Sequence, residues 1–133
     1  MCIRDRAYAL SDIALPGLDD HKVLYGSTSA ADVLAQLQKL GVKEIIVKNG
    51  PAGVLGYSDG KSFQSPAVPV KKVVDTTAAG DSFNGGYLSG RLNGLSPLAS
   101  CQYAAALASF VVEHTGAIAV SYTHLTLPTT PYV

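Results

Sequence analysis

The chain has 133 residues, with 10 Lys and Arg against 10 Asp and Glu, and its length allows one domain at most. Zero net charge and a pI near 6.8 exclude the basic surface that nucleic-acid binding requires, so nucleic acid is not an expected partner. With 47% hydrophobic residues but no apolar run near the roughly 20 residues of a bilayer span, the sequence predicts a soluble globular protein that does not bind membranes.

Both ends of the chain are expected to be foreign to this domain. Residues 1–6 (MCIRDR) lack the apolar core of a secretory signal, and residues 121–133 are rich in Thr and Pro without a period of 2 or 3.6. Both resemble translated adapter sequence at the edges of assembled reading frames. We therefore expect a domain over residues 7–119, between tails at 1–6 and 120–133, that is an internal piece of a longer protein.

Short apolar runs and helical stretches alternate from residue 12 onward. Residues 12–15 predict a short buried strand. Ser29 occupies an N-cap position before a predicted helix over residues 30–40, which Gly41 ends. The apolar face of this helix comprises Val33, Leu34, Leu37 and Leu40.

Three strands are predicted in the middle of the chain. They cover residues 43–48, 54–57 and 62–65. Glycine-containing turns at residues 49–53 and 58–61 join them, and the second of these is typical of a hairpin.

The last third of the chain predicts one more strand and two helices. An apolar strand is expected over residues 71–74, followed by a loop of small residues and a helix over residues 81–92. Pro97, which is favoured in a first helical turn, opens a last helix that runs towards Glu113. Helices that alternate with strands predict an α/β fold.

The candidate chemistry concentrates at residues 74–86 (VDTTAAGDSFNGG), where a strand, a small-residue loop and a helix start follow one another. The first amides of a helix have no intrahelical partner and carry partial positive charge, which suits a phosphoryl group. Ala78, Ala79 and Gly80 are small enough for an oxyanion to approach, and Gly80 is free to adopt a φ that larger residues resist.

Asp81 has two interpretations. A carboxylate beside an anion site would repel a phosphate unless it faces an acceptor hydroxyl, where it serves as a general base. An aspartate at a helix start is also among the commonest caps, with no chemistry implied.

The run at residues 75–83 (DTTAAGDSF) resembles the D-T-x-[AG]-A-G-D-x-F signature of the PfkB, or ribokinase-like, carbohydrate kinases. The resemblance covers about residues 11–119 and corresponds to the C-terminal part of that family's catalytic domain. It implies a ribokinase-like three-layer α/β/α fold. Segments similar to the family's 2-keto-3-deoxygluconate kinases are residues 11–15, 41–50, 75–88 and 116–118.

The resemblance implies ATP-dependent phosphorylation of a sugar or sugar acid hydroxyl, with Mg²⁺, in the cytoplasm. Asp81 would be the base, and the amides of Ala78, Ala79, Gly80 and Asp81 would hold the transferred phosphoryl group. Ribokinase- or fructokinase-type specificity and a non-catalytic remnant are the alternatives. Because the family's sugar contacts and lid lie upstream, the fragment alone is expected to be inactive, and the complete protein is a possible homo-oligomer.

Nucleotide contacts are expected at two further places. By the resemblance, Lys48, Gly50 and Gly53 lie beside the ATP phosphates, although the same residues are also typical of a surface turn. Residues of the last helix that would flank the adenine, or else pack in the core, are Tyr103, Ala104 and Leu107.

Two cation sites are implied. Asp75 and Thr77 match positions that hold a monovalent cation, K⁺, in many members of the family, or they tie the turn by side-chain hydrogen bonds. Asp20 matches the acidic end of an N-x-x-E motif that organises Mg²⁺, but Gly17 stands in place of the asparagine, which leaves a solvated helix-start charge as the alternative.

The remaining metal- and redox-active residue types predict no site. His21 and His114 lack partners at zinc spacing. Cys2 and Cys101 lie at opposite ends, which argues against a disulfide framework and fits a reducing cytosol, and Cys101 is expected to be a small buried hydrophobe.

Overall fold

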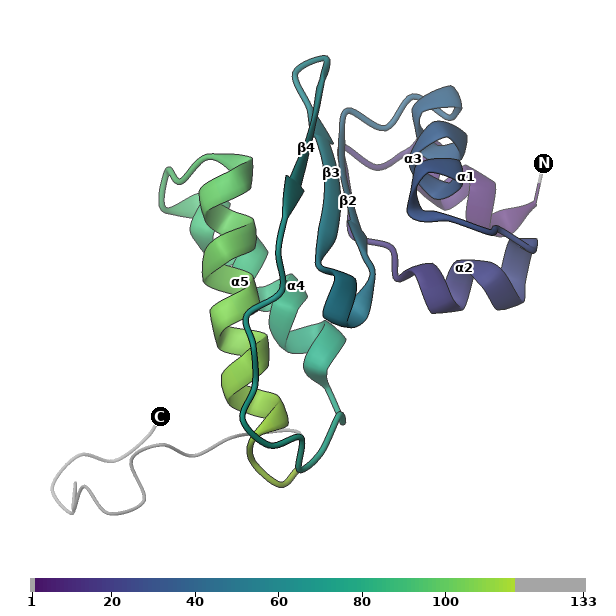
Figure 1. Cartoon of the computed structure of the whole chain (residues 1–133). Coiled ribbons are helices and arrows are strands. Elements are labelled where there is room, and N and C mark those ends of the chain that lie inside the picture. Colours follow the sequence, from purple (N-terminus) through teal and green to yellow (C-terminus); the bar gives the residue numbers. More distant parts are fainter. Residues whose placement is uncertain (1, 117–133) are drawn as a thin grey trace, which may run out of the picture.

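The computed structural model describes residues 2–116 as a four-stranded sheet with helices on both faces (Figure 1). The helices and strands, in chain order, are α1 (Ile3–Ala9), β1 (Ile13–Ala14), α2 (Leu18–Tyr25), α3 (Ala30–Lys39), β2 (Glu44–Lys48), the 3₁₀ turn η1 (Gly50–Ala52), β3 (Val54–Ser58), β4 (Lys61–Ser65), α4 (Ala79–Leu92) and α5 (Pro97–Val112). The predicted tail at residues 120–133 lies outside the described residues.

The strands lie in the order β1-β2-β3-β4. β1 and β2 are parallel, whereas the pairs β2–β3 and β3–β4 are antiparallel, and the turn between β3 and β4 is the predicted hairpin. The sheet is therefore mixed, with β2 as its buried central strand.

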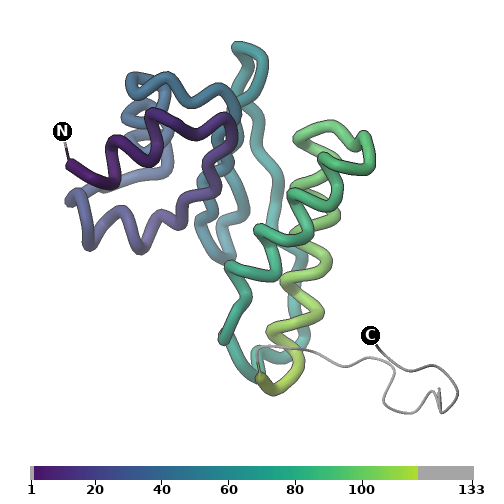
Figure 2. The backbone as a smooth tube through the Cα atoms, turned by 180° about the vertical axis from the view of Figure 1, so that it is seen from behind, coloured from purple at the N-terminus to yellow at the C-terminus, as the bar shows by residue number. Residues whose placement is uncertain are grey.

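Two hydrophobic clusters sandwich the sheet, because alternate β2 side chains point to opposite faces. Ile45 and Val47 pack with α3, and Ile46 packs with Phe83 and Tyr87 of α4. Figures 1 and 2 show α1, α2 and α3 on one side of the sheet and α4 and α5 on the other. The expected three-layer α/β/α arrangement is confirmed.

Capping residues place two of the predicted helices. The Ser29 hydroxyl accepts a hydrogen bond from the Asp32 amide at 3.1 Å, and α3 begins at the next residue, as predicted. Ser96 accepts from the Ala99 amide at 3.2 Å at the start of α5, where Pro97 is the first helical residue. The strands predicted over residues 12–15, 43–48, 54–57 and 62–65 are present, and no boundary shifts by more than one residue.

The strand predicted over residues 71–74 is wrong. This segment is irregular and exposed, with Val73 58% accessible. The amides of Val74 and Asp75 both donate to the carbonyl of Val112, at 2.8 and 3.1 Å. One carbonyl at the end of α5 therefore accepts the hydrogen bonds that a neighbouring strand would otherwise accept.

Two other predictions need correction. The helix expected to begin at Asp81 begins at Ala79, with Ala78 as its N-cap. The N-terminal helices α1 and α2 were not predicted, and α1 includes most of residues 1–6; that these residues are foreign to the domain stays a prediction. The helix α2 buries only Leu18 and His21, so the apolar stripe that would reveal it in the sequence is short.

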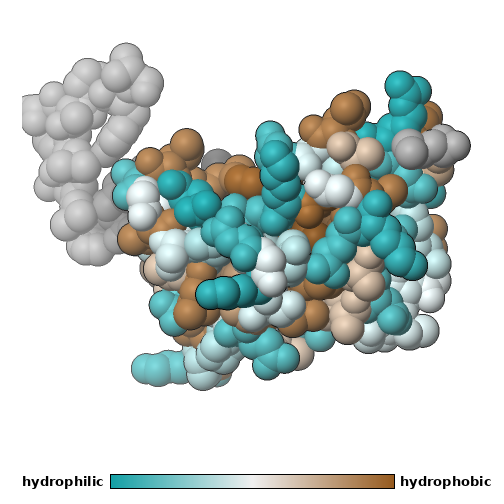
Figure 3. Space-filling view, turned by 90° about the horizontal axis from the view of Figure 1, so that it is seen from above, coloured by the Kyte–Doolittle hydropathy of each residue, from teal (hydrophilic) through white to brown (hydrophobic). Residues whose placement is uncertain are grey.

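The surface seen from above mixes apolar and polar side chains (Figure 3). Among residues 2–116, no helix combines the length and the apolar character that a bilayer crossing requires. The buried thiol of Cys101 packs in the second cluster, as predicted, and burial raises its pKa to about 12.

Gly53 and Gly60 provide a matched test of this packing. Both have positive φ, but a Cβ at Gly53 would overlap the Ser65 carbonyl oxygen, whereas nothing lies within 4 Å of a Cβ at Gly60. We expect Gly60→Ala to cost about 1–2 kcal/mol of unfolding free energy from backbone strain, and Gly53→Ala to cost more than about 3 kcal/mol because strain and overlap combine. Chemical denaturation measures both, and equal losses would contradict the close approach of β4.

Candidate active site

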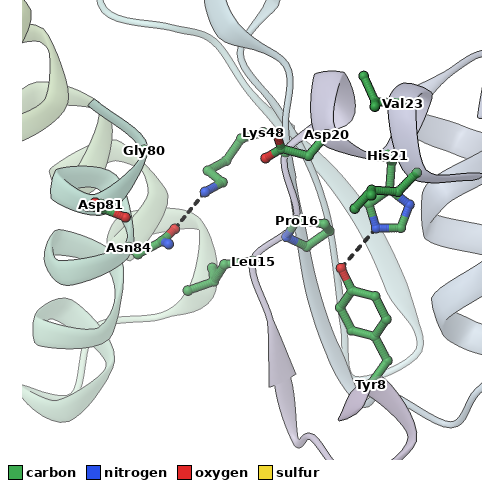
Figure 4. A pocket seen from close by; sticks show the side chains of 12 residues that line it. Tyr8, Leu15, Pro16, Asp20, His21, Val23, Lys48, Gly80, Asp81 and Asn84 are labelled. Carbon is green, nitrogen blue, oxygen red and sulfur yellow. Dashed lines mark hydrogen bonds between the residues drawn. The ribbon is translucent and has the colours of Figure 1, made fainter. Parts of the chain in front are cut away.

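A cavity of about 560 Å³ lies where the end of β2, the start of α2 and the start of α4 meet (Figure 4). This volume is within the range of small-ligand pockets. Its lining residues are Tyr8, Leu15, Pro16, Gly17, Asp20, His21, Val23, Leu24, Lys48, Gly80, Asp81 and Asn84.

The N-terminus of α4 reaches this cavity through a tight turn. The carboxylate of Asp75 accepts from the amides of Thr77, at 2.8 Å, and Gly116, at 2.9 Å. Ala78 then adopts a left-handed conformation, with φ 60°, from which the helix starts. The left-handed position expected at Gly80 is therefore at Ala78 instead.

The amides of this turn are not equivalent. The Ala79 amide donates to the Thr76 carbonyl at 3.2 Å. Within residues 2–116, the amides of Gly80 and Asp81 have no backbone acceptor, as expected for the second and third residues of a helix. A ligand anion at the helix start would meet these two donors.

Lys48 extends from the end of β2 towards α4. Its Nζ donates to Asn84 Oδ1 at 2.8 Å, as Figure 4 shows. Burial lowers the pKa of Lys48, whereas the nearby carboxylates of Asp20 and Asp81 favour its charged form and act in the opposite direction. The cavity therefore contains a half-buried cation beside two acidic side chains.

Asp81 and Asp20 approach the cavity from different elements. Asp81 is exposed in the first turn of α4, at its third residue and not at the N-cap. Asp20 is exposed in the first turn of α2, and its Oδ2 would lie 3.2 Å from a Cβ at Gly17. The carboxylate of Asp20 thus lies directly beside Gly17, the residue expected to stand in place of the asparagine of the N-x-x-E motif.

The structure does not bring every predicted nucleotide contact to the cavity. Gly50 is the first residue of the turn η1 and Gly53 follows its last residue, and neither is among the lining residues. Tyr103 and Leu107 lie on α5, partly exposed. Ala104 is fully buried against Gly86, whose Cβ would lie 3.0 Å from the Ala104 Cα, so the side chain of Ala104 packs in the core.

Asn84, Tyr8 and His21 line the cavity although no role was predicted for them. Asn84 is four residues after Gly80 and therefore on the same helix face, which is the signal that points to it. His21 is 1% exposed, and its Nε2 lies 2.9 Å from the Tyr8 hydroxyl. Nothing in the sequence pairs these two rings, because they lie on different helices.

The described residues contain no group of three or more His, Cys, Asp or Glu side chains that could hold a metal ion. Asp20 and Asp81 supply two carboxylates at one cavity. This donor set suits Mg²⁺, which usually binds one or two carboxylates, water and substrate phosphates.

Comparison with known proteins gives a family and named relatives. The family profile described as "pfkB family carbohydrate kinase" matches residues 2–124, a range that extends past both boundaries of the predicted domain. A protein of Dickeya dadantii (strain 3937) named 2-dehydro-3-deoxygluconokinase is 42% identical over 113 residues, or 83% of this chain and 36% of that protein.

Two further proteins agree with this match. The protein of the same name from Escherichia coli (strain K12) is 43% identical over 111 residues, or 81% of this chain and 36% of that protein. A crystal structure of a putative ribokinase II from E. coli, in complex with ATP and Mg²⁺, superposes with a TM-score of 0.76 at 32% identity, over 86% of this chain and 37% of that one. The chain therefore spans 36% of the length of these curated relatives.

The buried His21 predicts a pH dependence of stability. Burial lowers its pKa in the folded chain, so between the ordinary value and the lowered one the unfolded state binds more protons than the folded state. The free energy of unfolding is therefore not reduced by His21 above a pH of about 6.5, and it falls as the pH drops below that value. We expect His21→Gln to flatten this pH dependence, whereas the control His114→Gln keeps it. Chemical denaturation between pH 7.5 and 5 measures the free energy of unfolding of both variants. A pH dependence unchanged by His21→Gln would contradict its assignment to His21.

Proposed function

The chain belongs to the pfkB family of carbohydrate kinases, and we propose that the complete protein transfers the γ-phosphoryl group of ATP to a hydroxyl of 2-keto-3-deoxygluconate. One observation carries this proposal: a single cavity is lined by Lys48, by the start of α4 with its free amides, and by Asp81. These are a cation, anion-binding amides and a carboxylate, the groups that phosphoryl transfer to an alcohol requires.

Asp81 is the proposed general base. Its carboxylate accepts the proton of the substrate hydroxyl while that oxygen forms a bond to the γ-phosphorus and the bond from phosphorus to the ADP oxygen breaks. It lies in the first turn of α4 and lines the cavity, so it can reach a substrate hydroxyl that binds there.

The proposed contacts of the phosphoryl group are the amides of Gly80 and Asp81 and the Lys48 ammonium. Phosphoryl transfer gathers negative charge on oxygens, and donors already in place stabilise that charge without moving. Gly80 leaves room for a phosphoryl group beside these donors, because a Cβ at this position would lie 3.6 Å from Lys48 Nζ.

The proposal includes cations. Mg²⁺ bound with the ATP phosphates would be held on the protein side by Asp20, and it would neutralise charge on the transferred group. K⁺ bound by Asp75 and Thr77 is a separate element of the proposal. The two hydrogen bonds of Asp75, one on each oxygen, already tie the turn and leave further lone pairs on both oxygens.

The choice of substrate rests on similarity. Identity is 42% and 43% to two proteins named 2-dehydro-3-deoxygluconokinase, against 38% over a shorter alignment to a ribokinase of Arabidopsis thaliana. Ribokinase-type specificity is therefore the less favoured alternative. A homo-oligomer of the complete protein, a cytoplasmic location and inactivity of the fragment alone stay predictions.

Asp81→Asn tests the proposal in the complete protein. We expect kcat to fall by roughly 10²–10⁴-fold, because the base acts in the transition state, while the affinity for ATP changes little. The matched control is Asp19→Asn, since Asp19 is exposed on α2 and does not line the cavity. Steady-state ADP release with 2-keto-3-deoxygluconate, and with ribose and fructose as alternatives, measures both variants.

Three outcomes of this assay bear on the proposal. Near-normal turnover by Asp81→Asn would exclude Asp81 as the base. Turnover with ribose or fructose but not with the sugar acid would replace the substrate. An inactive complete protein would favour the non-catalytic remnant.

A further inference from the structure

The side chain of Asn84 is the hydrogen-bond partner of the Lys48 ammonium. The distance from Lys48 Nζ to Asn84 Oδ1 is 2.8 Å. Over the part of the chain that the structure describes, this is the sole hydrogen bond of Nζ, and no carboxylate lies within ion-pair distance of it. An ammonium has three N–H donors, so two remain available to a ligand in the cavity.

Three effects work against a fixed position for this ammonium. Lysine has a flexible four-carbon side chain. Burial disfavours the charge of Lys48. The positive end of α4 lies next to it, since Nζ would be 3.6 Å from a Cβ at Gly80, the second helical residue. Without an acceptor, the ammonium would gain solvation by turning out of the cavity.

Asn84 supplies that acceptor from the right place. It is one turn beyond Gly80, on the same face of α4, and it is half-buried. Its amide oxygen is neutral, so the hydrogen bond fixes the ammonium and leaves the full positive charge for a ligand. A carboxylate at this position would also fix the ammonium, but it would form an ion pair and compete with any anion.

We propose that Asn84 is a positioning residue, which holds the Lys48 ammonium beside the free amides of α4 without neutralising its charge. This inference rests on the proposed function, because it assumes that the anion at this site is a polyphosphate. Asn84 contacts neither the phosphoryl group nor the sugar hydroxyl and acts through Lys48 alone.

The test uses the full chain and inorganic tripolyphosphate as the probe. Brief acetylation with acetic anhydride, followed by mass spectrometry, gives the labelling rate of Lys48 relative to the exposed Lys61, and calorimetry gives the affinity for tripolyphosphate. The variants are Asn84→Ala, Asn84→Ser, Asn84→Asp and Lys48→Met. The matched control is Asn93→Ala, which removes an amide that donates to the Ser89 carbonyl at the other end of α4. Circular dichroism checks that each variant is folded.

Positioning and charge give different patterns in these variants. We expect Asn84→Ala and Asn84→Ser to speed Lys48 acetylation and to weaken tripolyphosphate binding, each by about tenfold, as for a lost hydrogen bond to a charged group. Asn84→Asp should keep acetylation slow yet weaken binding by a similar factor, because it holds the ammonium and neutralises it. Asn93→Ala should change neither measurement.

The inference fails if Asn84→Ala and Asn84→Ser leave Lys48 acetylation or tripolyphosphate affinity at the wild-type value, or if Asn84→Asp binds as tightly as the wild type. Lys48→Met separates this failure from that of the proposed function. Tripolyphosphate binding that is absent in the wild type, or unaffected by Lys48→Met, contradicts the phosphate site itself. Binding lost in Lys48→Met but retained in Asn84→Ala contradicts only the role of Asn84.

Discussion

The site depends on how one face of β2 docks along α4. Glu44, at the start of the strand, accepts hydrogen bonds from Tyr87 and from Arg91, whose Nε lies 2.9 Å from Oε1. Lys48, four residues later on the same face, contacts Asn84. The strand therefore runs towards the helix N-terminus, because its later residue contacts the earlier helical one. Buried Ile46 packs between these two polar contacts and excludes water from the interface.

This docking direction supports the proposal that the cavity binds an anion. The carboxyl end of β2 brings a lysine to the end of α4 where the amides of Gly80 and Asp81 are free, so three positive features converge. Two carboxylates, Asp20 and Asp81, face the same cavity and limit that charge. Such an arrangement suits a polyphosphate bound with a divalent cation, next to the neutral hydroxyl of a substrate. It also explains why Lys48 is held by the neutral side-chain amide of Asn84 and not by a carboxylate.

Much of the fold was predictable because its signals are local. The apolar face of α3, its Ser29 cap and the glycine-containing turn between β3 and β4 each act within a few residues. The errors arose where distant contacts decide. The segment before Asp75 has the sequence of a strand, but the amides of Val74 and Asp75 donate to the Val112 carbonyl of α5. The helix α4 begins at Ala79, two residues earlier than predicted, because of the turn that precedes it. At the site, Asp81, Lys48 and Asp20 were predicted from the family resemblance. The hydrogen bond between Lys48 and Asn84 was not predicted, because it forms only when β2 docks on α4.

The most direct test of the central claim is an NMR titration of the ¹⁵N-labelled chain with ATP and Mg²⁺. The account predicts that the amide resonances of Gly80 and Asp81 shift most, that the amide of Ala79, already bonded to the Thr76 carbonyl, shifts less, and that residues around Lys48 respond at the same ATP concentration. Shifts confined to α5, or unperturbed amides at Gly80 and Asp81, would contradict the claim that β2 and α4 together form the phosphate site.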